Sequence, residues 1–156
     1  AAGYTYGNND IWQMYSGEGI PVLDARLGWK KAMDLPGAYQ MQYMEEFFTS
    51  LEWQDLESTQ EFIKSSNPED SGYIVAAKTE EIALFYSPEG RSFLVNFQVS
   101  GMEKQKAFWF DPRKGTYEKQ ENPGKSGPFF FVPPTSGEGQ DWLLLVFFED
   151  RNLNKN

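Results

Sequence analysis

The sequence contains neither cysteine nor histidine. Without cysteine, the chain can form no disulfide, no zinc–thiolate site and no cysteine nucleophile. Without histidine, it can form no Ser-His-Asp or Cys-His triad and offers no histidine metal ligand. Acid–base chemistry within the chain would therefore depend on carboxylates, lysine or tyrosine. We predict no metal site and no cofactor.

A long apolar run and an excess of positive charge are also missing. The mean hydropathy is −0.60, which argues against a membrane span. The net charge of −9 argues against a nucleic acid or an anionic membrane surface as partner, because both need a basic face. The acidic residues are scattered along the chain, which favours a solvated surface over a specific acidic site.

Aromatic residues make up 17% of the chain and apolar residues 40%, which is enough for one large domain or a small domain with a helical segment. The sequence opens directly on a polar, aromatic stretch, AAGYTYGNNDIWQMY over residues 1–15. This stretch is typical of a core strand that runs into a site loop. We therefore expect the chain to be the back part of a larger protein.

Residues 1–66 carry helical signals. Asp34 can cap a helix, and Pro36 is well tolerated in its first turn. Apolar residues then recur at three- and four-residue spacing, at Ala38, Met41, Met44, Phe48 and Leu51. We predict a helix over residues 36–50, preceded by a shorter one over 27–33. The Met/aromatic stripe could be a ligand box, but it is more typical of packing against a partner layer.

A polar, turn-rich linker over residues 65–72 separates this part from the next. Short strands are predicted after it, at residues 73–77, 82–86, 93–97, 106–110, 116–118, 129–132 and 142–148. This spacing indicates an antiparallel β-sandwich over residues 72–148, followed by a polar tail at 149–156. The apolar runs at 129–132 and 143–148 do not alternate, which predicts strands covered on both faces, docked on the helical segment or the missing domain.

Several stretches, in one order along the chain, resemble a known family. In the first part they are residues 2–7 (AGYTYG), 11–15 (IWQMY), Trp29 and residues 34–38 (DLPGA). In the second part they are residues 73–77 (YIVAA), 86–91 (YSPEGR), 109–115 (WFDPRKG) and 131–142 (FVPPTSGEGQDW). Together they are similar to the carboxyl-terminal portion of apiosidase-like glycoside hydrolases. Those proteins join a TIM-type (β/α)₈ barrel to a β-sandwich known as a collagen-binding domain of a collagenase.

The resemblance implies an α+β fragment: the last β/α unit of the barrel, then a seven- or eight-stranded antiparallel β-sandwich. Residues 3–6 would be the last barrel strand and residues 36–50 the last barrel helix. The loop over residues 7–25 would lie at the carboxyl end of the barrel, where TIM-barrel active sites lie. Tyr4 stands where the family often has histidine. The family's proposed catalytic acids come from earlier barrel strands, so we expect no catalytic residue in this chain.

Candidate sugar contacts gather near the start of the chain. Tyr4, Tyr6 and Trp12 offer flat apolar faces that suit the C–H patches of sugars, and Asn8 can exchange hydrogen bonds with hydroxyl groups. The alternative for Trp12 is that it fills the barrel mouth.

The loop has acids at Asp10, Glu18 and Asp24. Glycosidases generally need two facing carboxylates. We expect none of these three to be catalytic, and we include Asp10 among the candidate sugar contacts. The alternative is that they cap loops or carry surface charge.

In the sandwich, Trp109 and Trp142 lie within apolar strands and are expected in the core. Asp111 and Arg113 lie in a predicted tight turn, where aspartate commonly caps backbone N–H groups. No residue pattern supports collagen binding.

The leading hypothesis is the carboxyl-terminal part of a secreted glycoside hydrolase. It would complete the barrel, line the sugar pocket and supply the sandwich. Its partners would be the amino-terminal barrel portion of the same protein and a carbohydrate substrate. We expect a bacterial-type secreted, periplasmic or cell-surface location, with a signal peptide upstream. The alternative is a non-catalytic module that binds glycan or a collagen-like ligand, and a third possibility is a purely structural domain.

Overall fold

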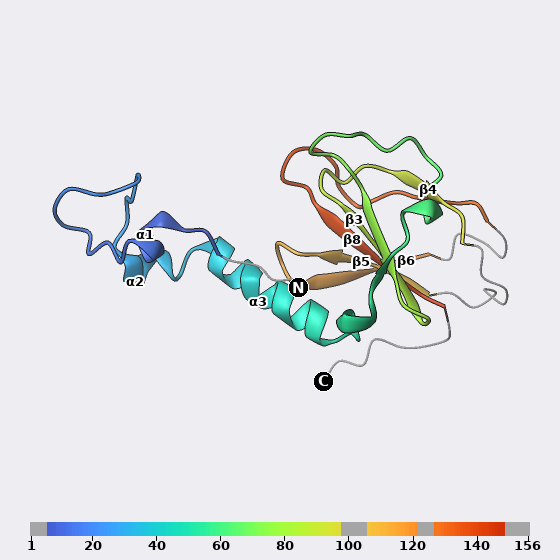
Figure 1. Ribbon diagram of the computed structural model, residues 1–156, viewed down its shortest axis with the longest axis horizontal. Helices are drawn as coiled ribbons and strands as arrows, with labels where there is room; N and C mark the ends of the chain where they lie inside the picture. Colours follow the sequence, from blue (N-terminus) through green and yellow to red (C-terminus); the bar gives the residue numbers. More distant parts are fainter. Residues whose placement is uncertain (1–5, 98–105, 122–126, 149–156) are drawn as a thin grey trace. The chain divides into compact units, whose positions relative to one another are not determined.

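The computed structural model describes residues 6–97, 106–121 and 127–148. The chain forms two compact units, Ala1–Phe47 and Phe48–Asn156 (Figure 1). Each unit is described by itself. Among the described residues, no helix is both long and apolar enough to cross a membrane.

The first unit is helical, with α1 at Asn9–Trp12, α2 at Trp29–Ala32 and the start of α3 at Pro36–Thr49. The prediction of a helix over 36–50 is therefore confirmed, and the shorter helix predicted over 27–33 is reduced to four residues. The predicted stripe on α3 is only partly buried, whereas Phe47, off that stripe, is buried. Most of the expected barrel strand, residues 3–5, lies outside the described residues.

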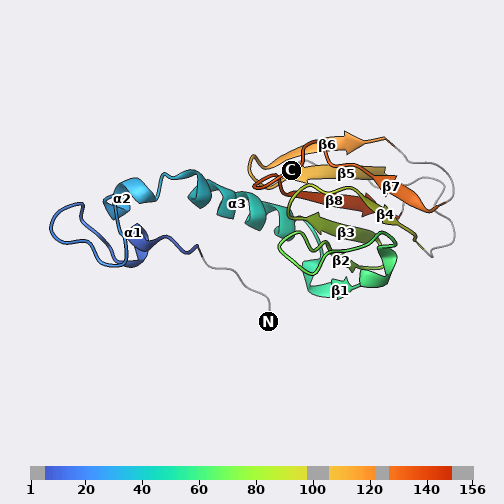
Figure 2. The ribbon, with the colours of Figure 1, turned by 90° about the horizontal axis from the view of Figure 1, so that it is seen from above.

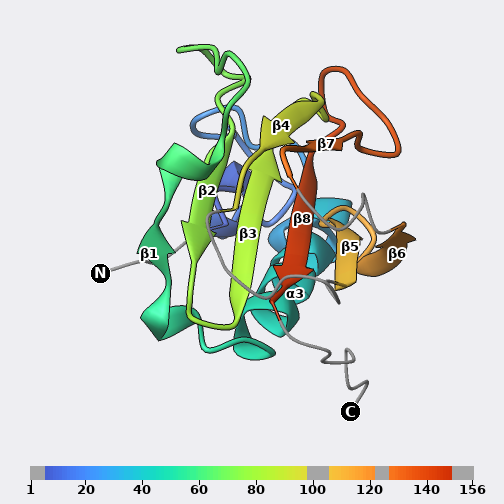
Figure 3. The same ribbon diagram turned by 90° about the vertical axis from the view of Figure 1, so that its right-hand side faces the viewer.

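The second unit is an antiparallel sandwich. The described strands form a six-stranded sheet in the order β1-β2-β3-β8-β5-β6 and a two-stranded sheet of β4 and β7. Figure 2 shows the larger sheet strand by strand, and Figure 3 shows β4 and β7 near the upper ends of β3 and β8. The bounds are β1 Glu57–Ser58, β2 Val75–Lys78, β3 Ile82–Ser87, β4 Phe93–Val95, β5 Lys106–Asp111, β6 Thr116–Gln120, β7 Phe129–Phe131 and β8 Trp142–Phe147.

All seven strands predicted from the sequence are present. The sequence did not predict β1, because its two residues are polar and show no apolar alternation. Glu57 and Ser58 nevertheless pair with Lys78 and Ala77 of β2. Short 3₁₀ helices, η1 at Trp53–Asp55 and η2 at Gln60–Phe62, flank β1. The sequence suggested a linker over residues 65–72 between two domains, and Glu57 and Ser58, which precede that linker, already pair with β2.

Aromatic side chains fill the space between the two sheets. Phe93 and Phe131 of the small sheet are fully buried, and Phe93 lies edge-on against Trp109 of the large sheet, with ring centroids 6.1 Å apart. Trp109 and Trp142 pack edge-to-face, 6.5 Å apart. Both tryptophans are therefore core residues, as the sequence predicted, and neither offers a ligand platform.

The expectation of full burial is right for β8 and wrong for β7. In β8, Leu144 and Val146 face the core, and Leu145 and Phe147 on the opposite face are buried as well. In β7, burial alternates, so Phe130 is 59% exposed. On its outer face β8 lies among apolar side chains of β3 and β5, such as Leu84 opposite Leu145 and Phe108, whose ring lies 6.2 Å from that of Phe147, whereas Phe130 on the outer face of β7 stays exposed.

Candidate functional site

The candidate sugar-binding stretch near the start of the chain is organised by Asn8. Its side-chain oxygen accepts hydrogen bonds from the backbone N–H groups of Asp10 and Ile11, at 2.9 and 3.2 Å. This is N-capping, which satisfies donors that a helix start leaves unpaired. The Asn8 side chain therefore has a local structural role at the start of α1.

Asp10 follows within α1 and is 8% exposed. Its Oδ1 accepts the backbone N–H groups of Arg26 and Leu27, the latter at 3.0 Å. These residues lie sixteen and seventeen positions further along the chain. The sequence could identify Asp10 as a candidate, but nothing in it pointed to the two backbone amides as its partners.

Trp12 is 64% exposed, and its indole N–H donates to the Tyr6 carbonyl oxygen at 3.1 Å. The indole donor is therefore in use, and the exposed part of the side chain is mainly its apolar ring. The Tyr6 ring is half-buried beside Gly37, where an added Cβ would lie 2.8 Å from a ring carbon. Tyr4 lies outside the described residues.

Residues 16–28 form a loop whose ends are tied together. The Trp29 N–H donates to the Tyr15 carbonyl oxygen at 2.7 Å, just outside both ends of the loop. Compact surface loops with adjoining ends are frequently functional. In or beside this loop, Met14, Leu23 and Asp24 have φ of 46°, 48° and 57°, a left-handed conformation that is costly for side chains other than glycine.

Large apolar side chains of this unit face outward rather than into its interior. In and around the loop they are Trp12, Met14, Ile20, Val22, Leu23 and Leu27. Ile20 is 94% exposed. Six large apolar side chains are thus exposed within residues 12–27, and where such residues form one patch it typically marks a contact with a ligand or another chain segment.

In the sandwich, Arg113 connects two of the stretches that carried the family resemblance. It forms a two-pronged ion pair with the fully buried Asp111, with Nε–Oδ1 at 2.7 Å and Nη2–Oδ2 at 3.0 Å. Its Nη1 donates to Gln140 Oε1 at 2.6 Å, and its guanidinium lies 5.1 Å from the centre of the Trp142 ring. The sequence predicted the Asp111 turn but not the link to Gln140.

The electrostatics of this cluster favour a structural role. Burial raises the pKa of Asp111, but hydrogen bonds from Arg113 and Lys114 outweigh it and hold the pKa below its usual range. Burial raises the pKa of Asp141, and a hydrogen bond from the Tyr86 hydroxyl opposes this. Because each charged group of the Asp111–Arg113 pair has several partners, this cluster fixes two loops rather than offering a free acid or base.

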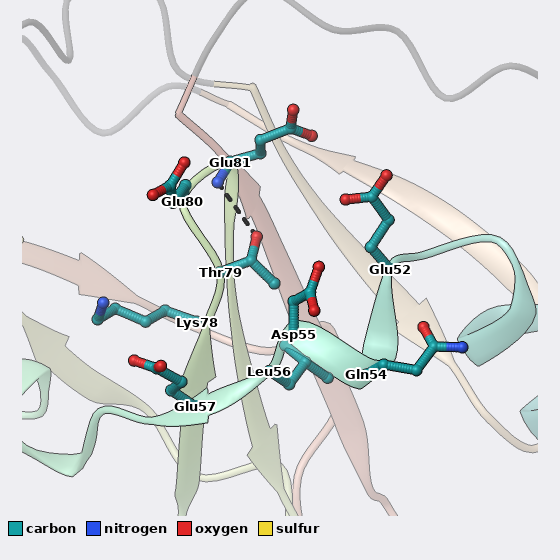
Figure 4. Close-up of a pocket in the computed structure, with 9 residues that line it drawn as sticks. All are labelled: Glu52, Gln54, Asp55, Leu56, Glu57, Lys78, Thr79, Glu80 and Glu81. Atoms are coloured by element: carbon teal, nitrogen blue, oxygen red, sulfur yellow. Dashed lines mark hydrogen bonds between the residues drawn. The ribbon is translucent and has the colours of Figure 1, made fainter.

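A pocket of about 560 Å³ opens at one edge of the large sheet (Figure 4). Its walls are the η1–β1 segment and the turn between β2 and β3. The lining residues are Glu52, Gln54, Asp55, Leu56, Glu57, Lys78, Thr79, Glu80 and Glu81.

Most of the pocket carboxylates are exposed. Within the described ranges, no group of three acids is arranged to hold a metal ion. Among the lining residues, Glu57 lies on the edge strand β1, where a charge discourages pairing with other sheets.

Comparison with known proteins matches both parts of the chain to families. Residues 1–55 match a family model described as "Apiosidase-like, catalytic domain", and residues 58–147 match one described as "Putative collagen-binding domain of a collagenase". Both resemblances predicted from the sequence are confirmed. No curated protein matches the chain.

Solved structures share the fold. One, titled a glycoside hydrolase, is 24% identical, with a TM-score of 0.86 over 97% of this chain and 34% of its own. Another, titled a glycoside hydrolase family 5 from Bacteroides vulgatus ATCC 8482, is 22% identical, with a TM-score of 0.86 over 98% of this chain and 34% of its own.

The chain thus spans about a third of the length of these two structures. The match over residues 58–147 covers more than half of the chain and coincides with β1 to β8 of the sandwich. The chain therefore belongs to the family described as the putative collagen-binding domain of a collagenase, preceded by a segment that matches the apiosidase-like catalytic domain.

Proposed function

We propose that this chain is the carboxyl-terminal part of a secreted glycoside hydrolase. Its first part supplies the last β/α unit of a (β/α)₈ barrel and lines the sugar pocket with residues 6–28. The sandwich is a rigid accessory module. The observation that carries this proposal is that residues 1–55 match a catalytic-domain family.

The geometry of the first unit supports a wall of a sugar pocket. Trp12 exposes its ring while its N–H is bonded within the chain, so a sugar would meet an apolar surface. Exposed aromatic faces with polar neighbours are typical of small-molecule sites. The closed loop over residues 16–28 presents further apolar side chains beside it.

The catalytic acids are proposed to come from an amino-terminal barrel portion of the same protein. Glycoside hydrolysis needs two carboxyl groups on opposite sides of the scissile bond. Asp10 is buried, and one of its oxygens accepts two backbone amides, so it is poorly placed to act as one of that pair. The substrate would be a carbohydrate held between the two portions.

The experiment is hydrolysis by the complete protein of a panel of 4-nitrophenyl glycosides that includes the apioside. We expect turnover of at least one of them. Trp12→Ala should raise KM about tenfold, as expected when a well-packed aromatic contact is removed. Trp53→Ala is the matched control, since Trp53 is an exposed tryptophan of the second unit, and it should leave KM within about twofold. Absence of turnover on every glycoside, or equal effects of the two variants, would refute the proposal.

The alternative is that the sandwich binds a glycan or a collagen-like ligand without catalysis. It is favoured by the family description and by two exposed apolar side chains, Phe130 on β7 and Val132 directly after it. Titration calorimetry of the complete protein with a triple-helical collagen peptide would test it. Binding that is lost in Phe130→Ala would support the alternative, and no binding would count against it.

A further inference from the structure

Asp10 forms a connection between α1 and the far end of the 16–28 loop. Its carboxylate is buried, and Oδ1 alone accepts two backbone N–H groups, from Arg26 and Leu27. Asn9 adds a neighbouring contact, because its Nδ2 donates to the Leu23 carbonyl oxygen at 2.6 Å. Two consecutive residues of α1 thus bind the returning half of the loop.

That half of the loop is the part that needs support. Leu23 and Asp24 have left-handed backbone conformations, which cost free energy and persist only where surrounding contacts impose them. Ile20 and Leu23 are exposed, so burial of their side chains does not hold the loop in place. The bonds from Asn9 and Asp10 are hydrogen bonds to backbone groups and therefore act directly on the loop's path.

We propose that Asp10 is a positioning residue, which holds the 16–28 loop in the shape of a sugar-facing wall without itself touching substrate. That the loop faces a sugar rests on the proposed function, whereas the hydrogen bonds between Asp10 and the loop do not depend on it. What the loop requires from residue 10 is an acceptor oxygen at one place. An asparagine can supply that oxygen without the charge, whereas a glutamate supplies the charge one methylene away.

Three variants of the complete protein separate these requirements. Asp10→Asn keeps the acceptor position and removes the charge. Asp10→Glu keeps the charge and moves the acceptor. Asp10→Ala removes both. Hydrogen exchange at the amides of Arg26 and Leu27 measures whether their hydrogen bonds to residue 10 are kept. The KM and kcat for the 4-nitrophenyl glycoside that the protein hydrolyses measure the effect on substrate binding and turnover.

We expect Asp10→Asn to keep both exchange and KM within about threefold of the parent protein. Asp10→Ala should speed exchange of both amides about tenfold to a hundredfold, because it removes the single acceptor atom that both N–H groups share. It should raise KM more than it lowers kcat, since a displaced wall weakens binding without removing a reacting group. Asp10→Glu should resemble Asp10→Ala.

Two results would overturn this inference. One is unchanged amide exchange in Asp10→Ala, which would show that the carboxylate does not hold the loop. The other is loss of activity in Asp10→Asn with retention in Asp10→Glu, which would show that charge at residue 10 is what matters. If the complete protein hydrolyses no glycoside, the proposed function fails, while the exchange comparison still decides whether Asp10 positions the loop.

Discussion

Replacing Arg113 with alanine should destabilise the sandwich strongly at neutral pH. The change leaves the Asp111 carboxylate, which is fully buried, without its two guanidinium hydrogen bonds of 2.7 and 3.0 Å. It also removes the bond to Gln140 and the contact of the guanidinium with the Trp142 ring. A buried charge that loses its partner is more costly than the pair was favourable, because the remaining group is still desolvated.

The magnitude follows from what remains around the carboxylate. Removing one partner of a buried ion pair costs about 3–5 kcal/mol. Lys114 Nζ stays 3.2 Å from Oδ2 of Asp111, and the backbone N–H of residue 113 still donates to Oδ1 at 3.0 Å. These contacts place the expected loss at the lower end, about 3 kcal/mol in the free energy of unfolding.

Urea unfolding followed by tryptophan fluorescence measures this loss. Arg91→Ala is the matched control, because its ion pair with Glu89, at 2.9 Å, is partly exposed, whereas the carboxylate of the Arg113 pair is fully buried. An exposed pair contributes about 1 kcal/mol or less. If Arg113→Ala loses no more stability than Arg91→Ala, the account of a buried, arginine-dependent carboxylate is refuted.

The pH dependence of the same variant gives an independent check. In the parent protein the pKa of Asp111 lies below its ordinary value of 3.8, since the hydrogen bonds outweigh the effect of burial. This stabilisation is present above pH about 4 and is lost as the pH falls further. Without Arg113, the effect of burial dominates and the pKa of Asp111 should rise. Protonation of Asp111 at low pH then removes the unpaired buried charge. The stability difference between the two proteins should therefore shrink as the pH is lowered from 7 to below 4.

Three further predictions concern the sandwich. Gly90→Ala should lower the free energy of unfolding in urea by more than about 3 kcal/mol, because a Cβ there would lie 2.1 Å from a backbone carbonyl oxygen. The control Gly139→Ala, also at positive φ but with open space around it, should lower it by only about 1 kcal/mol. By the same assay, Phe131→Ala should lower the free energy of unfolding by about 3–5 kcal/mol, whereas Phe130→Ala, on the exposed face of the same strand, should lower it by under about 1 kcal/mol. Equal losses in the two variants would contradict the faces assigned to these side chains. Burial and the neighbouring Asp141 carboxylate raise the pKa of Tyr86 to about 12. Ultraviolet titration should show that Tyr86→Phe removes one late-ionising tyrosine, and the contribution of Tyr86 to stability should be lost as the pH rises from about 10 to 12.

The strands could be predicted because their signals are local. Turn residues such as Pro88 and Gly90 separate apolar runs, and their preference for turns depends on the local sequence. The polar pair Glu57 and Ser58 gave no such signal, because its strand exists only through pairing with β2. Local pattern therefore decided where the apolar strands are but not where the sheet ends.

The candidate site shows the same division. The sequence identified Asn8, Asp10 and Trp12 as residues of interest from their types and their place in a polar, aromatic loop. It could not show that Asn8 caps α1 or that Asp10 binds amides sixteen and seventeen residues away. The contact of Asn8 and Trp12 with sugar stays a prediction, whereas Asp10 is proposed to hold the loop.

By itself, the sequence determined the chemistry that this chain lacks, the positions of its apolar strands and its family. Each of these depends on residue identity or short-range spacing. Only the tertiary structure decided that β8 is buried on both faces while β7 is not, and that Asp10 and Arg113 join distant loops. The physical reason is that burial and hydrogen-bond partners depend on which segments meet after folding, and a one-dimensional pattern does not contain that information.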